Sequence, residues 1–210
     1  DEVYSNVYAY HDLTLLFATL CFAVQIYCDF SGYSDMALGI ARSLGVKLSQ
    51  NFNKPYFSTS LRTFWRRWHI SLSGWFRDYI YLPIGGSKQG LLRMFLGVFI
   101  VFVLSGIWHG ANWTFLAWGA LHGVVLILEI IITKFVLKFT PTKKYWIYSL
   151  VAWCYCFVIV LISWVLFRAD SIQEAIYVFE QIFSLEGHWD YHLLDSFYIG
   201  QRSLFLAIAL

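Results

Sequence analysis

One histidine lies at the end of a long apolar run, where an imidazole can carry out acid–base chemistry. His109 follows the run Leu91–Trp108 and stands in the sequence Ser-Gly-Ile-Trp-His-Gly. Ionisable side chains at membrane depth are energetically expensive, which makes them candidates for a functional site. The charged form is disfavoured there, so the imidazole is available as a neutral general base. A hydrogen-bonded structural histidine is the alternative that position alone leaves open.

Two more histidines are candidates of a weaker kind. His69 stands on a polar stripe beside Arg66, where it is either a second active-site group or an interface residue. His122 lies within an apolar run, and a structural role such as holding a neighbouring helix is favoured for it. The other three occur in polar segments typical of solvated surface histidines: His11, His188 and His192.

Two carboxylates mark the end of the first apolar run. Asp29 and Asp35 belong to a dense polar cluster over residues 27–35. Helix capping and pairing with the basic segment that follows explain them better than catalysis does. We therefore expect the first membrane helix to end close to residue 30.

The sequence gives no local indication of redox, nucleotide-hydrolysing or serine esterase chemistry. It contains no GxGxxG, P-loop, HExxH or GxSxG pattern. The cysteines all fall in apolar runs, with neither CxxC spacing nor a metal-binding pattern. We expect no bound cofactor, metal ion or disulfide, and we expect buried thiols at Cys21, Cys28, Cys154 and Cys156.

The elements that position these residues are membrane helices. Hydrophobic residues make up 59% of the chain and charged residues 13%, with a mean hydropathy of +0.60, whereas soluble domains carry about 25% charged residues. Runs of about 20 apolar residues without strand-like alternation predict transmembrane helices. The fold class is therefore an all-α polytopic helical bundle, with spans at about 13–30, 91–108, 113–133 and 145–167 and a fifth from about 198.

The charges predict an orientation for these spans. Residues 41–90 contain eight basic side chains and one acid, and residues 134–144 contain four lysines. Two spans separate these basic segments, so both fit the cytoplasmic side, and residues 109–112 and the acidic stretch 168–195 then face outward. This bias explains the basic patch better than a nucleic-acid partner does.

The basic segment also contains a helical pattern. After the capping cluster Ser58–Ser60, apolar and aromatic residues recur at steps of three and four from Leu61 to Tyr79. This predicts a single basic amphipathic helix at the membrane interface, ending before Pro83.

Several motif blocks resemble one family over about residues 20–170. They are Asn51–Ser60 (NFNKPYFSTS), Phe64–Ser73 (FWRRWHISLS), Trp75–Gly86, Trp108–Thr114 (WHGANWT) and Trp118–Gly123 (WGALHG). Together they resemble the membrane-bound O-acyltransferases, in particular the bacterial branch typified by the alginate O-acetyltransferase membrane subunit. Because the chain begins without Met and ends in an apolar run, we expect residues 1–210 to be the C-terminal part of one larger transmembrane domain.

The resemblance implies an enzyme that moves an acyl group from a cytoplasmic thioester, acetyl-CoA or another, to a hydroxyl of an extracytoplasmic polysaccharide. It implies a bacterial inner-membrane location, lipid contact and an acceptor reached through a periplasmic partner protein. The principal catalytic histidine matches His109 and the second matches His69. Candidate supporting residues are His122, Asn112, Trp108, Asp29 and Asp35. A phosphorylated donor or an acidic carrier protein could be attracted by Arg62, Arg66, Arg67 and Arg77.

Other functions stay open at this point. Within the enzyme class, the resemblance also admits D-alanyl transfer towards teichoic acid, whose enzymes share the Trp-His-Gly core, and O-acetylation of peptidoglycan. Outside it, a transporter with an intramembrane histidine relay predicts substrate flux without acyl transfer. A membrane scaffold that recruits a separate transferase is the remaining alternative.

Overall fold

Four long apolar helices dominate the computed structural model, which describes residues 2–136, 146–184, 187 and 190. All four are long and apolar enough to cross a membrane. Helices coincide with three of the predicted spans to within two residues at either end, and the predicted span from about 198 lies outside the described residues. The helices are α2 (Asp12–Ser43), α6 (Leu91–His109), α7 (Trp113–Ile131) and α8 (Trp146–Arg168).

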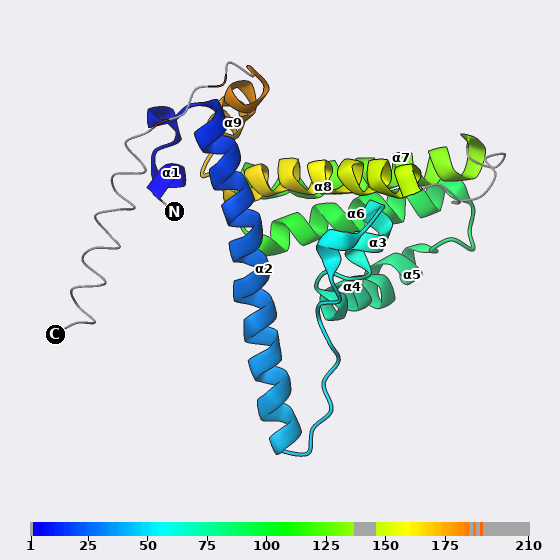
Figure 1. The fold of residues 1–210 in the computed structure, drawn as a ribbon. Helices are drawn as coiled ribbons and strands as arrows, with labels where there is room; N and C mark the ends of the chain where they lie inside the picture. The colour runs from blue at the N-terminus through cyan, green and yellow to red at the C-terminus, as the bar shows by residue number, and fades with distance from the viewer. Residues whose placement is uncertain (1, 137–145, 185–186, 188–189, 191–210) are drawn as a thin grey trace.

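Helices α6, α7 and α8 form a layer, and α2 runs crosswise to it (Figure 1). Helices α6 and α7 are antiparallel, and they approach closely because a glycine of each helix lies against the backbone of the other. A Cβ added to Gly106 would lie 2.3 Å from the carbonyl oxygen of Phe115, and one added to Gly119 would lie 2.2 Å from that of Phe102. Small residues allow such close backbone contact in membranes, where packing replaces the hydrophobic effect as the force between helices.

The first membrane helix is longer than expected. Helix α2 continues to Ser43, so Asp29 and Asp35 lie within a continuous helix and do not cap its end. The prediction of a helix end near residue 30 was therefore wrong. Residues 31–43 contain no proline, and Met, Ala and Leu among them favour helix. The extra turns project beyond the layer of the other helices (Figure 1).

The predicted amphipathic helix is interrupted. Ser60 caps its start as expected, with its side chain accepting a hydrogen bond from the backbone N–H of Thr63. The helix ends at Trp65, and His69 adopts a left-handed conformation just before the next helix begins, so the prediction of one continuous helix was wrong. Pro83 lies inside the last short helix and not beyond it. The segments are α3 (Leu61–Trp65), α4 (Ile70–Phe76), the π-helix η3 (Arg77–Tyr81) and α5 (Leu82–Ile84).

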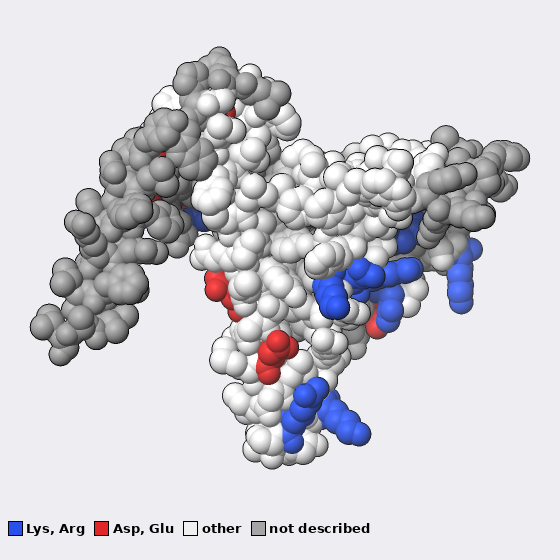
Figure 2. All heavy atoms as spheres, viewed as in Figure 1, with Lys and Arg blue, Asp and Glu red and all other residues white. Residues whose placement is uncertain are grey.

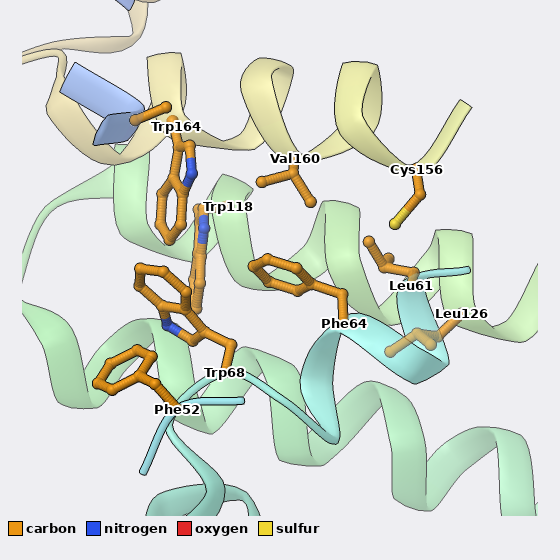
Figure 3. Packing of buried hydrophobic residues seen from close by; sticks show 10 residues of the cluster. Phe52, Leu61, Phe64, Trp68, Trp118, Leu126, Cys156, Val160 and Trp164 are labelled. Atoms are coloured by element: carbon orange, nitrogen blue, oxygen red, sulfur yellow. The ribbon is translucent and has the colours of Figure 1, made fainter. Parts of the chain in front are cut away.

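The main core lies between α3 and the helix layer (Figure 3). Trp68 of the turn after α3, Trp118 of α7 and Trp164 of α8 converge at one end of this cluster, and all three are buried. The rings of Phe64 and Trp68 stack with centroids 5.6 Å apart. Large aromatic side chains contribute extensive dispersion contacts, so this cluster fixes the segment after α3 against α7 and α8.

A smaller cluster covers the start of α2. It joins α1 (Glu2–Ser5), the 3-10 helix η1 (Val7–Ala9) and α9 (Ile172–Ser184).

The Lys and Arg side chains gather below the layer of α6–α8, while the upper surface of that layer is free of charge in this view (Figure 2).

Candidate functional site

A cavity of about 550 Å³ lies where the middle of α2 meets the ends of α6, α7 and α8. His109 ends α6, and His69 precedes α4; both imidazoles line this cavity. The sequence predicts both residues as catalytic candidates, but it places them on opposite sides of the membrane protein. The structure brings them together.

The cavity is apolar inside and polar at its rim. The buried rings of Trp68, Trp118 and Trp164 form its inner surface. The exposed polar residues of the lining are Gln25, Asp29, Asn112 and Asp170, which we call the rim. Such a combination suits a small reacting group inside and a polar molecule at the entrance.

Aromatic rings orient His109. Its ring centroid lies 5.2 Å from that of Trp118 and 5.1 Å from that of Phe167, both in edge-to-face geometry. Within the described part of the chain, no group hydrogen-bonds to its ring nitrogens, so no carboxylate orients this imidazole. Trp108 contacts the same ring at 4.9 Å but is 61% exposed and does not line the cavity.

His69 lies against α2. Its ring packs edge-to-face on Phe30 with centroids 4.6 Å apart. Its Nδ1 is buried without a hydrogen-bond partner among the described residues, which leaves Nε2 as the nitrogen that can meet a substrate. Burial, and secondarily the proximity of His109, lower the pKa of His69 to about 4. The ring is therefore neutral at physiological pH.

Asn112 joins two sides of the rim. Its Oδ1 caps α7 by accepting a hydrogen bond from the backbone N–H of Thr114 at 3.3 Å. Its Nδ2 donates to the carbonyl oxygen of Asp170 at 2.8 Å. This supporting candidate therefore holds the start of α7 beside the end of α8, next to His109.

Two other candidates lie away from the cavity. His122 is fully buried and does not line it; its Nδ1 accepts a hydrogen bond of 3.3 Å from Nε1 of Trp65. Asp35 is exposed further along α2 and does not line the cavity either. Of the two aspartates, only Asp29 reaches the rim.

The predicted donor-side arginines divide into two groups. Arg62, Arg66 and Arg77 line a second cavity of about 230 Å³, whose other walls are mainly apolar residues of α4 and α6. Arg77 is also paired with Asp78, with Nε 2.8 Å from Oδ1. Arg67 points elsewhere and donates to the carbonyl oxygen of Phe57 at 3.4 Å.

The rim residue Gln25 is missed by the sequence analysis. It lies one helical turn before Asp29, so both face the same side of α2. A polar side chain inside an apolar run is the signal that could have identified it.

As for metal ions, the described residues contain no group of three or more His, Cys, Asp or Glu side chains that could hold one.

Comparison with known proteins gives consistent matches. The family model described as MBOAT, membrane-bound O-acyltransferase family, matches residues 3–169. A probable alginate O-acetylase AlgI of Pseudomonas putida is 41% identical over 170 residues, which cover 81% of this chain and 33% of that protein. A peptidoglycan O-acetyltransferase of Helicobacter pylori is 39% identical over 169 residues, 80% of this chain and 31% of that protein.

A more distant match is a teichoic acid D-alanyltransferase of Bacillus subtilis. It is 35% identical over 112 residues, 50% of this chain and 28% of that protein. The alginate O-acetylase and the peptidoglycan O-acetyltransferase match this chain over most of its length. The chain itself spans only about a third of the length of these two relatives.

Proposed function

The chain belongs to the membrane-bound O-acyltransferase family, and we propose that the full-length protein transfers an acyl group from a thioester donor to a hydroxyl of a polysaccharide outside the cytoplasm. One observation carries this proposal: His69 and His109 line a single cavity that is large enough for reacting groups from two substrates. The chain contributes several membrane-crossing helices, and a bacterial inner membrane would give the donor and the acceptor access from opposite sides.

In this mechanism His109 is the general base. A ring nitrogen accepts the proton of the acceptor hydroxyl while the hydroxyl oxygen attacks the thioester carbonyl carbon. The carbon–sulfur bond then breaks, and the leaving thiolate takes the proton from the imidazolium, which restores the neutral ring. General base catalysis contributes roughly 10²–10⁴-fold. Positioning of the two substrates in the cavity must supply much of the remaining acceleration.

His69 is the second catalytic histidine of this proposal. Its Nε2 is the nitrogen left to reach the cavity, because Nδ1 is buried. As a neutral imidazole it can donate a hydrogen bond to the carbonyl oxygen of the thioester, where negative charge develops during attack. The buried tryptophans of the cavity would strengthen this interaction by excluding water.

The donor is proposed to be acetyl-CoA or another acyl thioester. The second cavity, lined by Arg62, Arg66 and Arg77, offers cationic groups for a phosphorylated donor or an acidic carrier protein. The exposed rim of the first cavity is proposed to face the acceptor, presented by a periplasmic partner protein. The amide and carboxylate groups of this rim can hydrogen-bond to the hydroxyls of the acceptor.

Acetyl transfer to an exopolysaccharide of the alginate type is the acceptor reaction that we favour. The alginate O-acetylase relative covers 81% of the chain at 41% identity, and the D-alanyltransferase covers 50% at 35%. O-acetylation of peptidoglycan is the second candidate, since that relative covers 80% of the chain at 39% identity.

The test is His109→Ala in the full-length protein, with His11→Ala as the control at an exposed histidine of the α2 start. We expect His109→Ala to lower O-acylation of the purified exopolysaccharide or cell wall by at least roughly 100-fold, and His11→Ala to leave it unchanged. Mass spectrometry of the ester distinguishes acetyl from D-alanyl transfer. Unchanged O-acylation by His109→Ala at normal expression would favour a transporter or scaffold.

A further inference from the structure

The backbone at His69 is in a strained conformation beside the cavity. Its φ of 45° and ψ of 56° lie in the left-handed region, which disfavours residues with a Cβ. Such conformations persist only where surrounding contacts hold them, and they are common at functional sites. The contacts that hold His69 therefore bear on its role.

Those contacts come from Asn51, which bonds to the two residues that follow His69. The carbonyl oxygen of Asn51 accepts a hydrogen bond from the backbone N–H of Ile70 at 3.0 Å. Its side-chain Oδ1 accepts two more from Ser71, from the backbone N–H at 3.0 Å and from the hydroxyl at 2.6 Å. One side-chain oxygen thus fixes the first turn of α4.

The same segment, residues 51–53, also bonds to the chain just before His69. The backbone N–H of Asn53 donates to the carbonyl oxygen of Arg67 at 3.0 Å. Residues 51–53 therefore bond to both sides of the Trp68–His69 pair. The left-handed residue 69 redirects the chain at the end of the turn between Trp65, where α3 ends, and Ile70, where α4 begins, so a right-handed backbone there would give the imidazole another direction.

We propose that Asn51 is a positioning residue, whose side-chain oxygen fixes the left-handed turn at His69 and so aims this imidazole into the cavity that it shares with His109. The inference rests on the proposed function, because it assigns how one of the two catalytic histidines is held. It names a residue with no direct access to the substrates, since Asn51 does not line the cavity.

The first test compares three variants of the full-length protein in its native membrane. Asn51→Leu removes the acceptor oxygen, Asn51→Asp keeps one, and Gln50→Leu removes a side-chain amide from the neighbouring exposed residue. We expect Asn51→Leu to lower the acyl-transfer rate by roughly 10- to 100-fold, because small displacements of a catalytic group have effects of this size. Asn51→Asp should recover most of the rate, and Gln50→Leu should match the wild type.

The second test separates positioning from general stability. If Asn51 acts through His69, Asn51→Leu should cause little further loss of rate in a His69→Gln background. Equal fold-losses in both backgrounds would overturn the inference, as would an Asn51→Leu variant as active as Gln50→Leu. A wild-type protein without transfer activity, or an active His109→Ala variant, would instead refute the proposed function itself.

Discussion

Glu129 of α7 accepts a hydrogen bond of 2.7 Å from the backbone N–H of Leu61, which joins a carboxylate inside a membrane-crossing helix to the first turn of α3. Two turns earlier on α7, His122 accepts the hydrogen bond from Trp65 at the other end of α3. Helix α7 thus holds α3 at both ends. Because α7 also carries Trp118 beside His109, it sets the relative position of the two cavity histidines.

Replacing Glu129 should loosen α3. The second carboxylate oxygen lies 3.3 Å from the backbone N–H of Arg62, so Glu129→Ala leaves two N–H groups of the first turn without this acceptor. Hydrogen bonds to charged groups contribute about 1.5–3 kcal/mol, and we expect a loss of this order in the free energy of unfolding in detergent. Glu129→Gln keeps one acceptor and should lose less. Equal losses for the two variants would contradict the assigned contact.

His122 should prove structural rather than catalytic. His122→Leu leaves the partly buried indole N–H of Trp65 without its acceptor, at a cost of about 0.5–1.5 kcal/mol in the free energy of unfolding. Acyl transfer per folded molecule should nevertheless remain well above that of His109→Ala, since His122 does not line the cavity. Transfer measured against the amount of folded protein checks this, and a loss as deep as that of His109→Ala would refute it.

Three of the membrane helices could be predicted almost to the residue. Long apolar runs ending at polar or glycine residues mark α6, α7 and α8 clearly. The end of α2 could not be predicted in this way. Asp29 faces the rim of a cavity, and a polar residue that serves a site inside a helix gives the same pattern as a helix end.

The break at His69 was equally hidden from the sequence. Apolar residues continue at helical spacing through Trp65, Trp68 and Leu72, so periodicity predicts one helix. The left-handed residue is fixed by contacts with Asn51, and single-sequence periodicity contains no information about such long-range bonds. For the same reason the motifs indicate His69 and His109 separately, while their shared cavity emerges only from the fold.

Acid should destabilise the folded protein partly through His69. Its pKa is lowered from 6.5 to about 4 in the folded state by burial and secondarily by His109. Between these two values the unfolded chain binds a proton that the folded chain does not, so the free energy of unfolding falls as the pH falls through this window. Below about pH 4 this residue contributes no further change.

His69→Gln should remove that contribution. We expect the midpoint of thermal unfolding in detergent to fall less steeply for this variant than for the wild type between pH 6.5 and pH 4. Parallel curves across this range would show that His69 is not shielded from protons in the folded state.

The close contact of α6 and α7 predicts which glycines cannot be replaced. An added Cβ at Gly119 or Gly106 meets a backbone carbonyl oxygen at 2.2 or 2.3 Å, and backbone cannot move aside as a flexible side chain can. Overpacking of this kind costs about 1–3 kcal/mol or more. Gly119→Ala and Gly106→Ala should therefore lower the free energy of unfolding, and they should also reduce acyl transfer because Trp118 and His109 flank the same interface.

Gly39→Ala is the matched control for these variants. Gly39 also lies within a membrane-crossing helix, α2, but a Cβ added there meets no other atom within 4 Å. Alanine reduces the conformational freedom of the unfolded chain, so this variant should be stabilised by about 0.4–1 kcal/mol. If Gly39→Ala and Gly119→Ala changed stability equally, helix propensity would explain both results, and the close packing of α6 on α7 would not be what requires glycine at position 119.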